Sequence, residues 1–160
     1  MIFKRKLLAA AAMLALSAGA QAQISGNVVK IGVLNDQSSL YADLSGQGSV
    51  LAARMAIEDF GAAKKGIKTE VIFADHQNKA DVGSQIANKW YDAEGVDVIV
   101  DTPNSGVALA VNQIAREKNT AYINVGSATA DLTGPACSPN TVHWAYATYM
   151  LAKSTGGARV

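Results

Sequence analysis

The chain has little of what catalytic and metal-binding proteins require. Its 160 residues include one cysteine, two histidines and 6% aromatic residues. His76 and His143 lie far apart and lack the spacing of metal ligands, so we expect structural or surface roles for both and no metal site. The nucleophile motif G-x-S-x-G is absent. These absences predict a protein that is not an enzyme and has neither catalytic residues nor a cofactor.

Patterns that bind phosphate groups and nucleic acids are also missing. The loop after the first expected strand lacks G-x-G-x-x-G and a Walker lysine, which argues against a Rossmann dehydrogenase. No basic patch favours nucleic acid. Cys137 has no second cysteine to pair with, so it is either a buried thiol or has its partner beyond residue 160.

The first 22 residues have the pattern of a cleavable export signal. Basic residues 4–6 precede an apolar run over 7–16, and Ala-Gln-Ala at 20–22 is a small-x-small cleavage site. The run is too short to cross about 30 Å of hydrocarbon, which argues against a membrane anchor. We therefore expect cleavage after Ala22, a periplasmic location, and a mature domain over 23–160. Cleavage leaves 11 of the 14 basic residues against all 13 acidic ones, a formal net charge of −2.

The mature region alternates strand-like and helix-like segments. The patterns predict strands over 28–34, 69–74, 96–100 and 121–125, and helices over 48–60, 80–94 and 106–118. Gly61 and Gly95 are expected helix stops. Beyond them, 128–140 reads as a loop, 141–144 as a short strand and 146–153 as a helix. This order predicts an α/β fold with an open, mostly parallel sheet and helices on both faces.

Ligands of such sheets bind beyond the carboxyl ends of the strands, and this sequence becomes polar at those ends. The loop after the first strand carries Asp36, Ser38, Ser39 and Tyr41. These side chains are either ligand contacts or a polar turn before the next helix.

Two further loops carry small polar residues. Ser105 is the expected N-cap of the third helix, whose first amides and positive dipole end suit a carboxylate ligand. Ser127 and Thr129 follow Gly126 after the fourth strand and offer hydroxyls for hydrogen bonds. The structural alternatives are capping alone and a plain surface loop. Trp90 is expected in the core, and Trp144 and Tyr146 are candidates for the ligand cleft.

Asp36, Asp101 and Ser127 at three strand ends also match the arrangement of phosphoacceptor receiver domains. The export signal counts against that function, because the phosphodonor is cytoplasmic.

Taken together, the segments VKIGVLNDQSSLYAD, GSVLAARMAIEDF, VIFADHQNKADVGSQIANKWYD, VDVIVDTPNSGVALAV and NVGSATADLTG resemble the start of a known family. The family is the periplasmic solute-binding proteins of branched-chain amino acid type ABC importers, which have a type I periplasmic-binding fold. The resemblance spans about residues 28–157. It implies two α/β lobes that clamp a ligand, of which this chain supplies the N-terminal one.

The resemblance also implies roles for individual residues. Ser105, Ser127 and Thr129 match positions that bind the ligand's carboxylate or polar head, and Tyr146 enters the cleft. The residues that match the cleft lining are Asp36, Ser38, Ser39 and Tyr41. Ala147 stands where relatives carry an acidic residue.

The implied function is capture of an amino acid or other small carboxylate by a monomeric protein and its delivery to an ABC permease. An extracytoplasmic sensor domain of a signalling receptor is the alternative, and an exported amidase ranks third.

Because one lobe supplies only one side of a clamp, we predict that residues 23–160 made alone bind ligand weakly or not at all. Isothermal titration calorimetry with amino acids and aromatic acids is the measurement. Micromolar binding by this segment would refute the prediction.

Overall fold

The sheet is the centre of the structure, a computed structural model that describes residues 25–155. Its strands are β1 (Val28–Asn35), β2 (Lys68–Asp75), β3 (Val98–Asp101), β4 (Ala121–Asn124) and β5 (Thr141–His143). All neighbouring strands pair in parallel, in the order β2-β1-β3-β4-β5. The predicted α/β fold is confirmed, and the sheet is parallel throughout. The predicted export signal lies outside the described residues.

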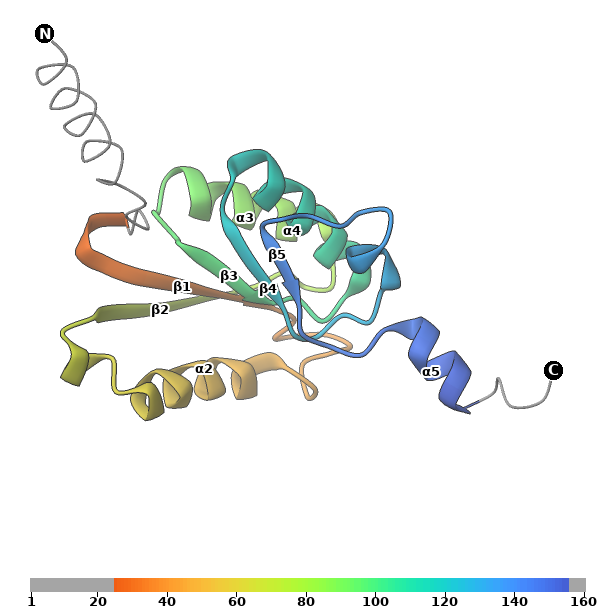
Figure 1. Cartoon of the computed structure of the whole chain (residues 1–160), viewed down its shortest axis with the longest axis horizontal. Helices are drawn as coiled ribbons and strands as arrows, with labels where there is room; N and C mark the ends of the chain where they lie inside the picture. The colour runs from red at the N-terminus through yellow and green to blue at the C-terminus, as the bar shows by residue number, and fades with distance from the viewer. Residues whose placement is uncertain (1–24, 156–160) are drawn as a thin grey trace, which may run out of the picture.

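The helices lie on both faces of this sheet. They are α2 (Gly46–Phe60), α3 (Ala80–Asp92), α4 (Ser105–Lys118) and α5 (Thr148–Thr155). Figure 1 shows α3 and α4 on one face, α2 on the other, and α5 extending away from the sheet. Within the described part of the chain, no helix has the length and apolar character needed to cross a bilayer.

Helix ends lie close to their predicted positions. Gly61 ends α2 with φ 69°, as expected of a left-handed stop, whereas α2 begins two residues earlier than predicted. Gly95 has φ 63°, but α3 already ends at Asp92. Asn119 ends α4 in the same left-handed conformation with φ 54°. Asparagine tolerates this region better than most residues, so it replaces glycine here.

The main core lies between the sheet and the α3–α4 layer. Leu34, Ile99 and Tyr122 on three neighbouring strands are fully buried, and they share one cluster with Trp90 of α3 and Val111 of α4. Trp90 is therefore a core residue, as predicted. Burial of apolar surface stabilises a fold by about 25 cal/mol per Å², so this layer supplies most of the apolar stabilisation.

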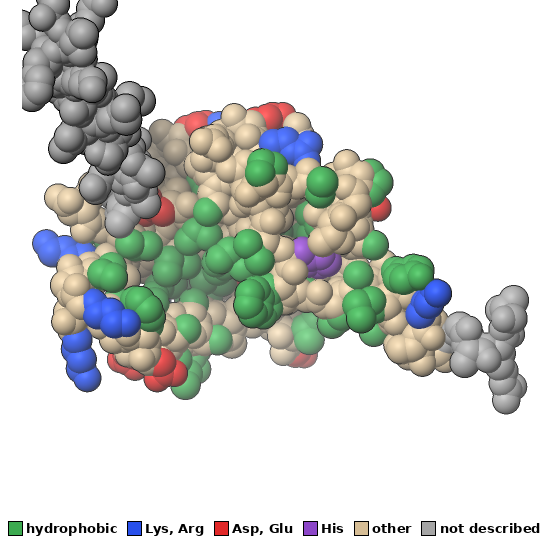
Figure 2. All heavy atoms as spheres, viewed as in Figure 1, with side chains coloured by type: hydrophobic (Ala, Val, Ile, Leu, Met, Phe, Trp, Pro, Cys, Tyr) green, Lys and Arg blue, Asp and Glu red, His purple; other side chains and the backbone are tan. Residues whose placement is uncertain are grey.

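The face that carries α2 is much less completely covered. Phe60, the last residue of α2, is 57% exposed. A hollow of about 580 Å³ lies between α2 and the sheet, lined by apolar residues that include Val29, Val33, Ala53 and Val125. Figure 2 shows hydrophobic side chains gathered in this hollow. Helical periodicity predicts a helix here, but it does not show how completely neighbouring residues cover the face of that helix.

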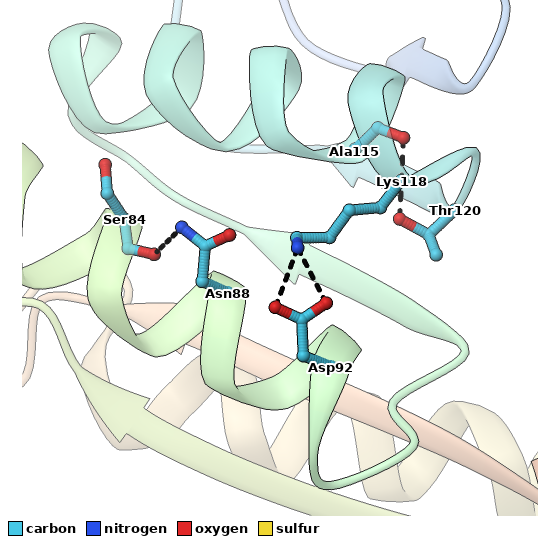
Figure 3. Close-up of polar contacts among 6 residues, drawn as sticks. All are labelled: Ser84, Asn88, Asp92, Ala115, Lys118 and Thr120. Carbon is cyan, nitrogen blue, oxygen red and sulfur yellow. Dashed lines mark hydrogen bonds and ion pairs between the residues drawn. The ribbon is translucent and has the colours of Figure 1, made fainter.

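Polar contacts hold the ends of α3 and α4 together (Figure 3). The Lys118 ammonium lies 2.6 and 2.8 Å from the two carboxylate oxygens of Asp92, which joins the last turns of the two helices. Thr120 donates to the carbonyl of Ala115 just after α4. A solvent-exposed ion pair contributes only about 0–1 kcal/mol, so apolar packing dominates this interface.

The tightest backbone approach lies under Trp90. A Cβ added at Gly32 of β1 would lie 2.5 Å from Cζ3 of the Trp90 ring. Strand β1 therefore needs glycine at this position so that α3 packs directly on the sheet.

We predict that Gly32→Ala lowers the free energy of unfolding by about 1–3 kcal/mol, because the added methyl group overpacks the core. Gly48→Ala is the matched control: it is in α2 with no atom within 4 Å of the added Cβ, and alanine stabilises a helix interior by about 1 kcal/mol. Urea unfolding of both variants measures the difference. Equal stability of Gly32→Ala and the wild type would contradict the predicted steric clash.

Candidate functional site

The strand register brings the polar strand ends into one row. Asn35 pairs with Asp75, Leu34 with Asp101, Asp101 with Asn124, and Asn124 with His143. The buried polar residues also concentrate at this edge or in the loops directly after it: Asn35, Asp36, Ser45, His76, Asp101, Thr102, Asn124 and Ser127. Buried polar groups are costly unless they are hydrogen-bonded, so the partners of each show what holds this edge together.

Asp36 organises the loop that follows β1. Its carboxylate accepts hydrogen bonds from the backbone N–H groups of Ser39 and Tyr41 and from the Ser39 hydroxyl, at 2.6–3.0 Å. Desolvation, the largest influence, raises the pKa of Asp36, but the hydrogen bonds together outweigh it and hold the pKa below the usual 3.8. Asp36 is thus an anion that holds its own loop, and a direct contact with ligand stays a prediction.

Asp75 at the end of β2 holds the same loop from the other side. Its carboxylate accepts from the Ser38 hydroxyl at 2.6 Å and from the backbone N–H of Gln37 at 3.0 Å. The hydroxyls of Ser38 and Ser39 are therefore already donating within the loop. Tyr41 is half-buried, and its phenol group has no hydrogen-bond partner among residues 25–155.

The chain leaves β3 through a sharp turn. Asp101 and Thr102 both have left-handed backbones, with φ 85° and 60°. The turn is fixed from both neighbouring strands: the Thr102 N–H donates to the carbonyl of Leu34 at 2.9 Å, and the Asn124 amide donates to the carbonyls of Asp101 and Thr102 at 3.2 Å. Consecutive left-handed non-glycine residues persist only where surrounding contacts over-determine them.

The side chain of Asp101 is buried at the centre of the edge. It is 3% exposed, and the Asn35 amide donates to its Oδ2 at 3.2 Å and to the Gly46 carbonyl at 2.7 Å. Desolvation by burial raises the pKa of Asp101 above its usual value, although hydrogen bonds from Ser49 and Asn35 oppose the shift. Through these contacts Asp101 joins β1, the start of α2 and its own turn.

The N-cap of α4 is Asn104, one residue before the predicted Ser105. The Asn104 side chain accepts from the Val107 N–H at 3.0 Å, and Ser105 is the first helical residue. The prediction placed the N-cap one residue too late, because asparagine and serine are about equally good N-cap residues. Ser105 is half-buried, and its hydroxyl and the N–H groups of Ser105 and Gly106 have no partner among the described residues.

The loop after β4 lies directly against this turn. A Cβ at Gly126 would lie 2.8 Å from Cα of Pro103 and 2.9 Å from Oδ1 of Asp101, so only glycine fits. Contact at Gly126 brings the loop that precedes Ser105 against the loop that carries Ser127. Ser127 is 0% exposed and its Oγ has no hydrogen-bond partner in the described structure. Buried polar side-chain atoms without a partner are rare in native structures, so this hydroxyl is a candidate ligand contact.

Thr129 begins the 3-10 turn Ala130–Thr133, and its hydroxyl accepts from the Asp131 N–H at 3.3 Å. Its hydroxyl proton remains available to another acceptor, because a hydroxyl both donates and accepts. The structural and ligand-binding interpretations of Thr129 are therefore compatible.

The segment after β5 runs beside the Ser127 loop. Thr148 N–H donates to the Ala128 carbonyl at 2.7 Å. Tyr146 and Trp144, which are 56% and 77% exposed, line an open hollow together with Val125, His143 and Ala145. Tyr146 is thus near the candidate site, as expected, and its contact with ligand stays a prediction.

The structure gives the two histidines and Cys137 distinct surroundings. His76 is fully buried, accepts from the Asn78 N–H through Nδ1, and has an unpartnered Nε2. His143 is half-buried and its Nε2 contacts the Ser127 carbonyl at 2.9 Å, a contact that no sequence pattern indicated.

Cys137 is exposed, so the buried-thiol alternative is wrong. Among residues 25–155, no group of His, Cys, Asp and Glu side chains is arranged to hold a metal ion.

We predict that Asp101→Asn changes the pH dependence of stability. A raised pKa in the folded state means that folded Asp101 binds its proton more tightly than the unfolded chain does. The wild type therefore loses stability relative to Asp101→Asn as pH rises from 3.8 through the raised pKa, by up to about 1.4 kcal/mol per pH unit.

Urea unfolding between pH 4 and pH 8 measures this difference. Asp59→Asn, at an exposed position of α2, controls for the loss of one negative charge. A difference between wild type and Asp101→Asn that grows in favour of the wild type as pH rises would contradict the prediction.

Comparisons with known proteins give the chain a family. A model of the periplasmic binding protein family matches residues 28–160. A periplasmic binding protein from Burkholderia mallei is 48% identical, with a TM-score of 0.79 over 84% of this chain and 36% of that one. No curated protein sequence matches the chain.

Two further solved structures are similar. A branched-chain amino acid ABC transporter periplasmic ligand-binding protein from Burkholderia xenovorans is 38% identical, with a TM-score of 0.71 over 79% of this chain. An ABC transporter solute-binding protein from R. palustris in complex with benzoate is 26% identical, with a TM-score of 0.75 over 82% of this chain. This chain spans 36% of the length of each. The chain belongs to the periplasmic binding protein family.

Proposed function

We propose that the chain supplies one side of the ligand site in an extracytoplasmic solute-binding protein, which captures a small carboxylate for an ABC permease. The observation that carries the proposal is the buried, unpartnered Ser127 hydroxyl beside the first turn of α4. Leaving a buried hydroxyl unpaired costs about 1–3 kcal/mol, and a ligand that accepts its proton would remove this cost.

Several hydrogen-bonding groups at this edge have no partner among the described residues. The donors include the backbone N–H groups of Ser105 and Gly106, at the positive end of the α4 dipole, and the hydroxyls of Ser105 and Ser127, whereas the buried Asn124 Oδ1 is an unpartnered acceptor. By contrast, the carboxylates of Asp36 and Asp75 are occupied by their own loop. Free N–H donors at a helix N-terminus favour an anionic group, and a carboxylate is such a group.

The similar proteins support this ligand class. The R. palustris relative holds benzoate, and the B. xenovorans relative is described as a branched-chain amino acid transport protein. Both kinds of ligand carry a carboxylate on an apolar body. In our proposal the exposed rings of Trp144 and Tyr146, and the half-buried Tyr41, meet that apolar part.

In the proposed mechanism a second lobe closes over ligand that is held at this edge. Closure follows only if the ligand's contacts favour the closed state over the open one. The family indicates an extracytoplasmic location. To this we add, as parts of the proposal, cleavage after Ala22, a monomeric state and an inner-membrane permease as partner.

A thermal-shift screen of the full-length polypeptide that carries this sequence tests the ligand class. We expect stabilisation by amino acids or aromatic acids and none by neutral sugars. A response to sugars or to cations alone would contradict the proposal.

We predict that Ser127→Ala moves stability and affinity in opposite directions. Without the buried unpaired hydroxyl, the unliganded variant should be at least as stable as the unliganded wild type. The free energy of binding the carboxylate should weaken by about 1–3 kcal/mol. Melting temperature without ligand and calorimetric Kd with it are the two measurements. Ser84→Ala in α3 is the control, since that hydroxyl donates to the Ala80 carbonyl and is not a candidate ligand contact. Unchanged affinity in Ser127→Ala would remove Ser127 from the site.

We also predict that Ser105→Ala and Thr129→Ala each weaken binding by about 1–3 kcal/mol if their hydroxyls are buried by the ligand. Thr129→Ser is the control that should bind like the wild type, because serine keeps a hydroxyl that accepts from the Asp131 N–H and can donate to a ligand. Calorimetry on the three variants is the measurement. No loss of affinity in Ser105→Ala or Thr129→Ala would exclude that residue from the site.

A further inference from the structure

His143 is the last residue of β5 and reaches the loop that follows β4. Its register partner is Asn124, and its ring Nε2 lies 2.9 Å from the carbonyl oxygen of Ser127. A carbonyl oxygen only accepts hydrogen bonds, so Nε2 carries the proton and donates it. The Ser127 carbonyl is therefore held by a side chain from a neighbouring strand.

This contact fixes the direction of one peptide group. In a trans peptide the C=O and the following N–H point in opposite directions, and the described structure has no cis peptides. Because the Ser127 carbonyl points at the His143 ring, the Ala128 N–H points away from it. The next peptide is oriented in the same manner, since the Ala128 carbonyl accepts from Thr148 N–H. Neither the Ala128 nor the Thr129 N–H has a hydrogen-bond partner among residues 25–155.

Backbone pairing does not reach the Ser127 peptide. The Trp144 N–H donates to the Asn124 carbonyl at 2.7 Å, which is where the contacts between the β4 and β5 backbones end. Beyond that point the Ser127 carbonyl depends on the imidazole.

We propose that His143 is a positioning residue of the ligand site: its imidazole orients the Ser127–Ala128 peptide so that the Ala128 N–H, with the Thr129 N–H, donates to the ligand's carboxylate. This inference rests on the proposed function. His143 itself touches the loop and not the ligand. The oriented peptides give the site two backbone N–H donors besides the hydroxyls of Ser127 and Ser105.

The test uses two substitutions that differ in whether the side chain donates a hydrogen bond. His143→Phe keeps a ring but removes the N–H donor. His143→Gln removes the ring but keeps an N–H donor on a side chain of similar reach. Val142→Thr is the control on the same strand, at an exposed position whose side chain alternates to the opposite face. Benzoate and L-isoleucine are the probes, titrated into the full-length polypeptide by calorimetry, with unliganded melting temperatures measured in parallel.

We expect His143→Phe to weaken binding of the preferred probe about tenfold or more, since hydrogen bonds to a charged group are involved. His143→Gln should restore affinity to within about threefold of wild type, and Val142→Thr should match wild type. In ¹⁵N-resolved NMR spectra, the Ala128 and Thr129 amide protons should shift downfield on ligand binding in wild type and in His143→Gln.

Several results would overturn the inference. Wild-type affinity in His143→Phe, or equal weakening in His143→Gln and His143→Phe, would show that the imidazole does not act by orienting the peptide. Ligand binding without a shift of the Ala128 amide would show that this N–H is not a donor. If the wild type binds no carboxylate at all, the proposed function fails, and this inference fails with it.

Discussion

The turn by which the chain leaves β3 determines the arrangement of the whole carboxyl edge. Two consecutive left-handed residues, Asp101 and Thr102, would be unfavourable on their own, and hydrogen bonds from both neighbouring strands hold them in place. The buried Asp101 carboxyl then contacts the Asn35 amide on one side and packs against Gly126 on the other. The three loops that carry the candidate ligand residues are therefore fixed relative to one another by one buried side chain and its backbone.

The two carboxylates of the β1 and β2 ends have internal partners, whereas several donors at this edge do not. The carboxylates of Asp36 and Asp75 are taken up by the loop after β1, which they hold in shape. The Ser127 hydroxyl and the first amides of α4 remain without partners among the described residues. For the proposed carboxylate ligand such an edge would be pre-organised, because the cost of ordering those donors is met during folding rather than on binding.

The two faces of the sheet differ in how much they contribute to stability and in how much apolar surface they leave exposed. On one face, α3 and α4 pack closely enough that Gly32 leaves no room for a Cβ beneath Trp90. On the other face, α2 leaves a hollow and an exposed Phe60. Exposed apolar patches of this kind commonly mark interaction surfaces. The candidate site depends mainly on the well-packed face, since α4 begins there.

The sequence by itself determined the succession of strands and helices along the chain, a mostly parallel sheet and the candidate edge for a site, because hydrophobic periodicity and turn residues are local signals. It also placed Ser105, Ser127 and Thr129 on the loops that the structure brings together. Only the tertiary structure decided which groups remain free. Asp36 has internal partners while Ser127 has none, and His143 contacts Ser127 only because β5 pairs with β4. Hydrogen-bond partners distant in the sequence follow from register and packing, which no local pattern encodes.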